Sequence, residues 1–428
     1  MPGTAALDLG GFAELNSVSC ASAGNCAAGG DYADGSSAQP FVVDETNGVW
    51  GTAIEVPGMA ALNGGVFGGS VSSVSCSSPG NCAAGGGYAD GSANGHAFVV
   101  NETNGVWGNA IEVPGTADLN VAGDAGVNSV SCDSADDCAA GGYFSYAVDK
   151  DGSPKHQAFV VSEHGGVWGQ ATVVPGTVLG GAYASNVASL SCAGAGDCVA
   201  GGNFSDPAHK AHGFVVAERS GTWRNAIKVP MGVKSVSCAT PGNCMAGGSR
   251  YVVAEKNGKW GKTINLLAVL VKAGRYAEVS SVSCASAGSC AAGGWYTDNA
   301  HHVQPFVAGE KRGTWGKAIK VPGWAALNVG GNIGKGWPLV AGVSCASPGN
   351  CAATGIYFDS SHKHQAFVVS EQSGVWGKAV EVPGTAALEA GGGYAEASSI
   401  SCADPGSCAV GGLYTNGSGP GQVFVTAP

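Results

Sequence analysis

The chain contains few charged residues and no long apolar run, and both absences narrow the classes of protein it can belong to. Asp, Glu, Lys and Arg make up 12% of its 428 residues, and positions 1–149 hold sixteen Asp and Glu but no Lys or Arg. A net charge of −11 with a wholly acidic first third disfavours nucleic acid and anionic membranes as partners. No stretch of eighteen apolar residues is present, so no membrane-spanning helix is expected.

Helical periodicity and catalytic motifs are missing as well. The segment nearest to a helix, residues 266–271, is too short to decide. The sequence has no nucleophile elbow, phosphate-binding loop or zinc-binding helix motif, so an enzyme is not expected. A glycoside hydrolase or lyase is a less favoured alternative, because it needs one asymmetric pair of carboxylates and the candidate carboxylates here recur regularly.

A cysteine-containing stretch recurs eight times and organises the whole chain. Its first copy runs from Ser17 to Gly30 and begins Ser-Val-Ser-Cys. The sixteen cysteines form eight pairs with an offset of six: Cys20 and Cys26, Cys76 and Cys82, Cys132 and Cys138, Cys192 and Cys198, Cys238 and Cys244, Cys284 and Cys290, Cys345 and Cys351, Cys402 and Cys408. The first cysteines follow one another at intervals of 56, 56, 60, 46, 46, 61 and 57 residues.

Each copy is predicted to form four short strands, A to D. Strand A ends in Ser-Val-Ser-Cys, strand B starts at the second cysteine, and in the first copy strands C and D cover residues 41–45 and 49–56. Four-stranded units at this period predict an all-β, eight-bladed β-propeller in one domain, with seven blades as the alternative. The expected blades are 16–58, 70–115, 127–176, 187–230, 233–269, 280–323, 341–384 and 398–428.

The cysteine pairs are predicted to form one disulfide per blade, across the A–B hairpin. Metal binding is the competing interpretation, but it needs four converging ligands, and propeller symmetry would hold the pairs apart. Eight disulfides imply an oxidising compartment, so a secreted, extracellular protein is expected. No cofactor is expected, with calcium or zinc as a minor alternative suggested by histidine spacings such as His362 and His364.

The two ends of the sequence lie inside repeats. Residues 1–7 match the Pro-Gly-Thr-Ala-Ala-Leu segment at 383–388, and no signal peptide is visible. The eighth copy stops in strand C, and only seven copies carry the tryptophan of strand D. We therefore expect a leader or another domain before Met1 in the natural chain, and our hypothesis is that this upstream region supplies the missing outer strand of blade eight.

Length variation between the copies identifies one face of the ring as the candidate site. In a propeller the A–B and C–D turns share one face, and the B–C loops and D–A connections share the other. The two turns are nearly constant here, whereas almost all insertions fall in the loops and connections. Because loops on a rigid scaffold commonly carry function, the variable face is the predicted binding face.

Polar and aromatic residues recur on this predicted face. Strand B ends in Gly-Gly-x-Tyr-x-Asp, and Gln or His stands two residues before the strand C aromatic. The candidate ligand-binding residues are Tyr32, Asp34, Tyr88, Asp90, His96, His212, Trp295, Tyr296, Asp298, Trp337, Tyr357 and Asp359. The structural alternative is that Asp starts an Asx-turn, Gln or His bonds the hairpin backbone and Tyr packs between blades.

Strand C carries a recurrent glutamate beside the C–D turn, in seven copies: Glu45, Glu102, Glu163, Glu218, Glu255, Glu310 and Glu371. Its place on the constant face favours a structural role, such as accepting hydrogen bonds from turn backbone N–H groups. The strand D tryptophan is likewise interpreted as packing.

The full-length repeat pattern, from Ser-Val-Ser-Cys to Val-Pro-Gly, resembles repeats in secreted actinobacterial proteins. The C–D hairpin, as in residues 370–376, is similar to the Asp-box hairpin of sialidase-type propellers, although Glu replaces Asp and the Gly-to-Trp spacing is one residue shorter. Related propellers include lectins, which supports binding by analogy. Sialidases grip their substrate with three arginines. Three of the five arginines here, Arg219, Arg224 and Arg312, belong to C–D hairpins, which disfavours that activity.

Two classes of function follow from these patterns. The first is a lectin-like propeller that binds a glycan or cell-surface polysaccharide, with the role of a targeting module in a larger protein or secreted complex as one form of it. Repeated weak sites on one face would gain avidity. The second is a scaffold for a protein partner or an upstream domain, which would show one large apolar patch rather than repeated polar pockets.

Overall fold

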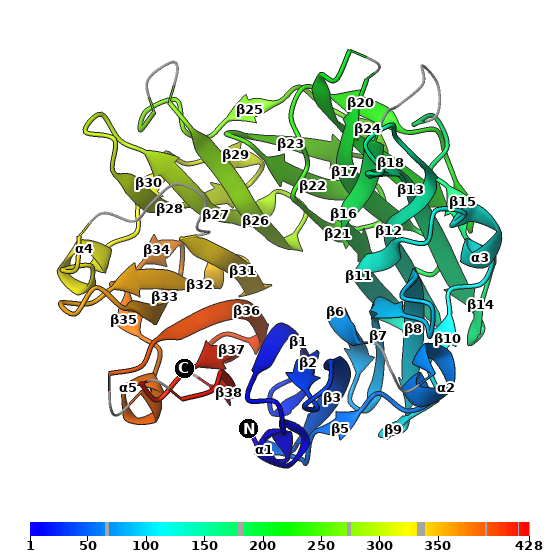
Figure 1. Cartoon of the computed structure of the whole chain (residues 1–428). Coiled ribbons are helices and arrows are strands. Elements are labelled where there is room, and N and C mark those ends of the chain that lie inside the picture. The colour runs from blue at the N-terminus through cyan, green and yellow to red at the C-terminus, as the bar shows by residue number, and fades with distance from the viewer. Residues whose placement is uncertain are drawn as a thin grey trace.

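Eight antiparallel sheets stand around a ring in the computed structural model, one for each copy of the repeat (Figure 1). The structure describes residues 1–64, 68–177, 184–206, 208–271, 275–331, 339–389, 392–417 and 419–427. The prediction of an all-β, eight-bladed propeller is confirmed. The seven-bladed alternative is excluded, because each of the two shortest repeats forms a sheet of its own.

The first two strands of every blade form the A–B hairpin. The innermost strands are β1 (Ala13–Ser22), β6 (Gly69–Ser78), β11 (Ala125–Ser134), β16 (Ala184–Cys192), β21 (Ser235–Thr240), β26 (Ala277–Ser286), β31 (Val340–Ser347) and β36 (Ala395–Asp404). Their partners are β2 (Asn25–Ala33), β7 (Asn81–Ala89), β12 (Asp137–Val148), β17 (Cys198–Ser205), β22 (Asn243–Gly248), β27 (Ser289–Thr297), β32 (Asn350–Phe358) and β37 (Ser407–Tyr414).

The third strands carry the buried aromatic and the recurrent glutamate. They are β3 (Ala38–Thr46), β8 (Gly95–Thr103), β13 (Pro154–His164), β18 (Ala211–Arg219), β23 (Tyr251–Lys256), β28 (Val303–Lys311), β33 (His364–Gln372) and β38 (Gln422–Thr426).

The predicted strand D is split in blades one to seven, so their sheets have five strands rather than four. Both short pieces pair with the third strand. The first pieces are β4 (Val49–Trp50), β9 (Val106–Trp107), β14 (Val167–Trp168), β19 (Thr222–Trp223), β24 (Lys259–Trp260), β29 (Thr314–Trp315) and β34 (Val375–Trp376). The second pieces are β5 (Ile54–Glu55), β10 (Ile111–Glu112), β15 (Thr172–Val173), β20 (Ile227–Val229), β25 (Ile264–Asn265), β30 (Ile319–Lys320) and β35 (Val380–Glu381).

In the part of the chain that the structure describes, five one-turn helices follow Pro-Gly pairs. The sequence pattern did not predict them, because four or five residues show no helical period. They are α1 (Thr4–Leu7), α2 (Met59–Asn63), α3 (Thr116–Leu119), α4 (Trp324–Leu327) and α5 (Thr385–Leu388). Each is preceded by a glycine in the left-handed region, such as Gly58 with φ 81°. None of the described helices has the length or apolar character that a bilayer span requires.

All eight predicted disulfides are present. In each A–B hairpin the two cysteines stand directly opposite one another, as Cys20 pairs with Cys26 across β1 and β2. Their Cα atoms lie 3.9–4.0 Å apart in every pair. The offset of six therefore reflects a tight A–B hairpin, and the disulfide links its two strands next to the turn.

The hydrophobic core lies between the blades rather than within them. Eight clusters are described, one at each interface, and each joins residues of two neighbouring blades. At the junction of blades eight and one, Ala409 and Val423 pack with Leu15 and Phe41. The ring is therefore closed through side-chain packing, and Figure 1 shows the two ends of the chain on adjacent blades.

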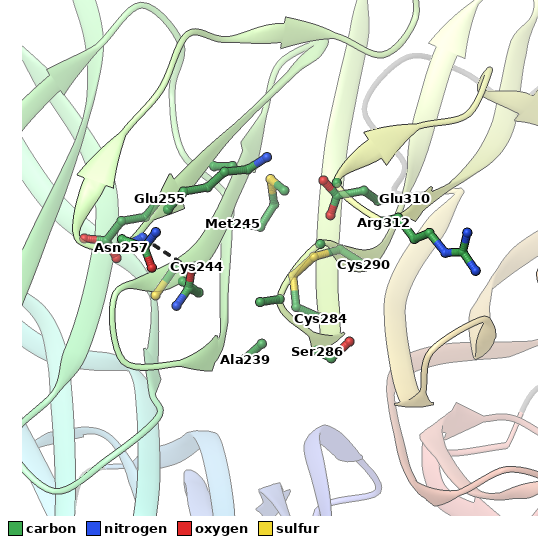
Figure 2. A pocket seen from close by; sticks show the side chains of 16 residues that line it. Ala239, Cys244, Met245, Glu255, Asn257, Cys284, Ser286, Cys290, Glu310 and Arg312 are labelled. Atoms are coloured by element: carbon green, nitrogen blue, oxygen red, sulfur yellow. Dashed lines mark hydrogen bonds between the residues drawn. A yellow bond between two sulfur atoms is a disulfide. The ribbon is translucent and has the colours of Figure 1, made fainter.

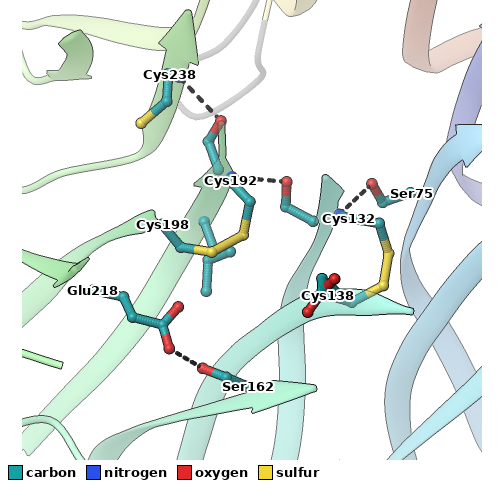
Figure 3. The surroundings of a disulfide bond; sticks show 12 residues. Ser75, Cys132, Cys138, Ser162, Cys192, Cys198, Glu218 and Cys238 are labelled. Atoms are coloured by element: carbon teal, nitrogen blue, oxygen red, sulfur yellow. Dashed lines mark hydrogen bonds between the residues drawn. A yellow bond between two sulfur atoms is a disulfide. The ribbon is translucent and has the colours of Figure 1, made fainter. Parts of the chain in front are cut away.

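The two serines of Ser-Val-Ser-Cys form a belt of hydrogen bonds around the ring. Ser73 and Ser75 of blade two accept the backbone N–H groups of Val130 and Cys132 in blade three, both at 3.0 Å. Figure 3 shows three such bonds in succession, to the backbone nitrogens of Cys132, Cys192 and Cys238. The same bonds cross every interface, and Gly342 interrupts the belt once by replacing the first serine of blade seven.

The Gly-Gly pair of the second strand is required by two different close approaches. A Cβ at Gly85 would lie 2.8 Å from Val127 of the next blade, and a Cβ at Gly86 would overlap the carbonyl oxygen of Ser70. Blade seven departs from this rule, because Thr354 replaces the first glycine. The next blade has Ala397 at the position of Val127, which leaves room for the larger side chain.

Blade eight has three strands, and the N-terminal segment lies against it. The amino nitrogen of Met1 is 3.2 Å from the carbonyl oxygen of Val423, just as the Val56 N–H bonds the carbonyl of Pro40 in blade one. Met1 thus occupies the place that the valine of Val-Pro-Gly takes in other blades.

Candidate functional site

Two faces of the ring can be distinguished from the hydrogen bonds of their loops. On one face, the C–D turn bonds the A–B turn, as when Gly48 N–H donates to the carbonyl of Gly24 at 2.8 Å; we call this the turn face. On the other, the B–C loop bonds the D–A connection, as when Gly95 N–H donates to Gly123 at 2.7 Å; we call this the loop face. Candidate site residues lie on both.

The four predicted tyrosines of the loop face are buried inside the blades. Tyr32, Tyr88, Tyr296 and Tyr357 are each 3–6% exposed. The hydroxyl of Tyr357 donates to Glu381 at 2.9 Å, and burial, followed by this carboxylate, raises the pKa of the phenol. These side chains therefore pack the end of each sheet and present little surface to a ligand.

The predicted aspartates hold the B–C loops in shape. The Oδ1 atom of Asp90 accepts the N–H groups of Ser92 and Asn94 at 2.8 and 2.9 Å, and Oδ2 lies 3.3 Å from Nε2 of His96. These hydrogen bonds, with the Asn94 N–H first, lower the pKa of Asp90 to about 2. Equivalent turns are formed by Asp34, Asp298 and Asp359.

The two predicted histidines bond to the aspartates that hold the B–C loops. His96 stacks on Tyr88 with ring centres 5.2 Å apart and lies between Asp90 and Glu112. Nε2 of His212 lies 2.9 Å from Asp206. The aspartate turns are those of the structural alternative, whereas the two histidines pair with carboxylate side chains and not with the hairpin backbone.

The two predicted tryptophans lie elsewhere. Trp295 is half-buried on β27 and packs against the core cluster between blades six and seven. Trp337 lies outside the described residues. Neither tryptophan therefore contributes to a binding site among the described residues.

An open depression on the loop face lies between blades three and four. It measures about 170 Å³, and Asn186 of β16, Asn203 and Phe204 of β17, and His156 of β13 line it. Phe204 stands where four other blades have a buried tyrosine but is only half-buried. Phe204 pairs with Ser185 on the side of the sheet that faces blade three, whereas Asn186 pairs with Asn203 on the other side. There the Asn203 amide donates to the carbonyl of Val233 in blade five at 3.3 Å.

On the turn face, pockets recur at equivalent positions between blades. They measure about 630 Å³ between blades one and two, 260 Å³ between blades five and six and 250 Å³ between blades seven and eight. A disulfide of each blade contributes to the walls. Figure 2 shows the second of these pockets, with Glu255 and Glu310 on opposite sides. The recurrent glutamates thus line pockets, which the sequence interpretation did not anticipate.

Three of the recurrent strand C glutamates are buried and take hydrogen bonds from side chains of the preceding blade. The hydroxyl of Ser162 donates to Glu218 at 2.6 Å (Figure 3), Asn101 donates to Glu163, and Nη2 of Arg219 lies 2.5 Å from Oε1 of Glu255. Sequence reasoning proposed turn backbone donors instead. The partner is a side chain because the glutamate faces the neighbouring sheet.

Glu102 departs from this pattern. It is 1% exposed, and within the described part of the chain it alone has both carboxylate oxygens buried without a hydrogen-bond partner. Asp44 stands opposite, with its own carboxylate 2.9 Å from Nε1 of Trp107. Burial, followed by the charge of Asp44, raises the pKa of Glu102 to about 7. A perturbed carboxyl group in a pocket is a recognised sign of a functional site.

A metal site is not formed by the residues that the structure describes, since no three His, Cys, Asp or Glu side chains converge on one point there. The histidine spacings noted in the sequence are accounted for in part by pairing with carboxylates: His364 lies 2.7 Å from Glu396.

Comparisons with known proteins show the fold and no family. No family model and no curated protein matches the sequence. Sqt1 of Chaetomium thermophilum, bound to the N-terminus of ribosomal protein L10, is 10% identical with a TM-score of 0.53, and 98% of each chain is covered. The Hadza microbial sialidase Hz136 has 12% identity and a TM-score of 0.41 over 81% of this chain and 74% of that one. The WD40 repeats of RRP9 have 11% identity and a TM-score of 0.41 over 84% and 87%. By structure, the chain is a β-propeller with one disulfide in each of eight blades.

Proposed function

We propose that this protein is a secreted, lectin-like propeller that binds a cell-surface polysaccharide on its loop face. The observation that carries the proposal is the depression between blades three and four. There Phe204 offers an apolar ring, and Asn186 and Asn203 line the depression with planar amides, of which the Asn203 amide also donates to the carbonyl of Val233. An aromatic surface packs against the C–H groups of a sugar, while carboxamides both donate to and accept from its hydroxyl groups.

The remaining predicted residues support such a site indirectly. The Asp-centred turns, such as that of Asp90, fix the B–C loops that surround the binding face. A loop held by its own hydrogen bonds loses little conformational entropy when a ligand binds. Secretion is part of the proposal, because eight disulfides persist in an oxidising environment.

A glycan array with the oxidised protein tests this function. Binding to one glycan class should fall at least tenfold in the Asn186→Ala and Phe204→Ala variants. Asn299→Ala is the matched control, because it removes an exposed carboxamide from a loop of blade six. A blank array with folded protein, or equal losses in all three variants, would refute carbohydrate binding at this depression.

A protein partner is the second candidate, and the turn face favours it. Valine side chains of the C–D turns stand out from the rim of four blades, at Val49, Val106, Val167 and Val375, with 68–71% of each exposed. The same face carries the unpartnered carboxylate of Glu102. Apolar contacts around a buried charged anchor are typical of protein interfaces.

A further inference from the structure

Among the described residues, the turn-face pocket between blades one and two is lined by a buried glutamate, Glu102, with neither carboxylate oxygen hydrogen-bonded. At three interfaces the preceding blade supplies a donor to the buried glutamate, from Asn101, Ser162 or Arg219. Asn101 and Ser162 stand three residues after the strand C phenylalanine, and Arg219 stands five residues after it. Two positions in the repeat are therefore able to provide the partner.

Between blades one and two, neither position provides a donor suited to Glu102. Asp44 occupies the place of Asn101 and Ser162, and Thr46 occupies the place of Arg219. Asp44 accepts a hydrogen bond from Trp107 and adds a second negative charge instead of a donor. Both oxygens of Glu102 are left without a partner in a wall of the pocket. A buried carboxyl group in this state is costly unless something pairs with it.

The pocket has the size and the surroundings to admit an external group. At about 630 Å³ it is more than twice as large as the pockets between blades five and six and between blades seven and eight. Asp44, Glu45 and Glu102 line it, and the first 149 residues contain no lysine or arginine. Unscreened acidic charge in a recess attracts cations.

The equivalent interface between blades four and five shows which cation fits. There the guanidinium of Arg219 reaches the glutamate at the same place in the repeat, with Nη2 2.5 Å from Oε1 of Glu255. A guanidinium presents its donors in a planar fork that matches carboxylates, and it is less strongly hydrated than an ammonium group. The contact between Arg219 and Glu255 thus shows, within this chain, how a guanidinium group pairs with the recurrent glutamate.

We propose that the pocket between blades one and two binds the side chain of an arginine from a partner protein, with Asp44 and Glu102 as its acceptors. The arginine enters past Thr46, the rim position from which Arg219 reaches its own glutamate. This inference goes beyond carbohydrate binding and is independent of it, because the two sites lie on opposite faces of the ring.

The test uses Nα-acetyl-arginine methylamide as the probe, titrated against the oxidised full chain by saturation-transfer NMR. The matched probe is the citrulline analogue, which keeps the shape and lacks the charge. We expect one site with a dissociation constant on the order of 1 mM, as for a single small anchor, and at least tenfold weaker binding of citrulline. Equal binding of the two probes, or no binding of either, overturns the proposal.

Two substitutions in the protein sharpen the test. Thr46→Arg should fill the pocket from within, as Arg219 does between blades four and five, and abolish binding of the probe while the melting temperature is kept or raised. Arg219→Thr should open an equivalent pocket over Glu255 and raise the stoichiometry from one to two.

The outcomes remain distinguishable if one variant folds poorly. Thr46→Arg alone decides the matter when Arg219→Thr gives little folded protein, because unchanged binding in Thr46→Arg places the probe elsewhere and overturns the proposal. A negative glycan array together with arginine binding would refute only the carbohydrate function, and the reverse result would refute only this site.

Discussion

Replacing Glu102 with glutamine should stabilise the protein at alkaline pH and leave it almost unchanged in acid. The folded state holds the pKa of this carboxyl group at about 7, against an ordinary value of 4.5, because the group is buried and faces Asp44. Below pH 4.5 the group is protonated in both states. Between pH 4.5 and about 7 the unfolded chain has released this proton while the folded protein still holds it, so stability is lost progressively over that range and the full loss is present above it.

The size of the effect follows from the two pKa values. A difference of about 2.5 corresponds to roughly 3 kcal/mol in the free energy of unfolding, at 1.36 kcal/mol for each factor of ten. Glutamine has the same shape and cannot ionise, and its Nε2 group is able to donate to Asp44. The Glu102→Gln variant should therefore not lose this free energy of unfolding as the pH is raised.

Thermal unfolding with intact disulfides measures this difference. An unfolding entropy of about 2.1 cal/mol/K per residue gives roughly 0.9 kcal/mol/K for a chain of this length, so 3 kcal/mol corresponds to about 3 °C. The melting temperature of Glu102→Gln, relative to the parent, should be about 3 °C higher at pH 8.5 than at pH 4. Glu45→Gln is the control, because Glu45 stands at the same place in blade one and is less buried. A difference that does not change with pH would refute the reasoning.

Three further predictions concern the ring itself. Gly86→Ala should destabilise the fold by more than about 3 kcal/mol, since its methyl group would overlap the carbonyl oxygen of Ser70, whereas Gly91→Ala should be tolerated because its surroundings are open; yield and melting temperature check both. Ala397→Val should be destabilising beside Thr354 and tolerated once Thr354→Gly is added, and a double-mutant cycle that shows additivity would contradict the proposed compensation. Reduction of the disulfides should lower the melting temperature markedly, because each short loop contributes roughly 2 kcal/mol to stability in the chain-entropy model; an unchanged melting curve after complete reduction would contradict this.

The architecture was predictable because its determinants are local. The offset between Cys20 and Cys26 fits a tight hairpin, and the turn residues between them mark its position. Eight repeats of such a unit leave few alternatives to a ring. The split of strand D was not predictable, because nothing in the sequence of residues 51–53 marks a break, although these residues belong to neither short strand.

The roles of the most repetitive residues could not be deduced from one copy. Ser75 and Gly85 are explained by atoms of the next blade, namely the N–H of Cys132 and the side chain of Val127. A repeat pattern shows that such residues matter, but it does not show which surface they face. The same limit applies to Glu102, whose partner position is 58 residues earlier.

The candidate site was predicted in part. Tyr88, Asp90 and His96 do come together at the end of a blade, as their spacing suggested. Their mutual hydrogen bonds and burial were not visible in the sequence. A signal for the turn-face pocket was present nevertheless: aligned by repeat, Asp44 stands alone as an acid where Asn101 and Ser162 are neutral donors.

The hydrogen bonds of the serine belt all run the same way around the ring. They also link the first and last blades, so the inner strands at the chain ends are joined as at other interfaces. Every bond runs from an N–H group of one blade to a hydroxyl of the blade before it, and Ser399 and Ser401 continue the series onto Val18 and Cys20. The interface between blades eight and one is therefore bonded between its innermost strands in the same way as the other interfaces. Opening of the ring should begin at its outer circumference, where β38 is the last described strand of its sheet, and should reach the axis last.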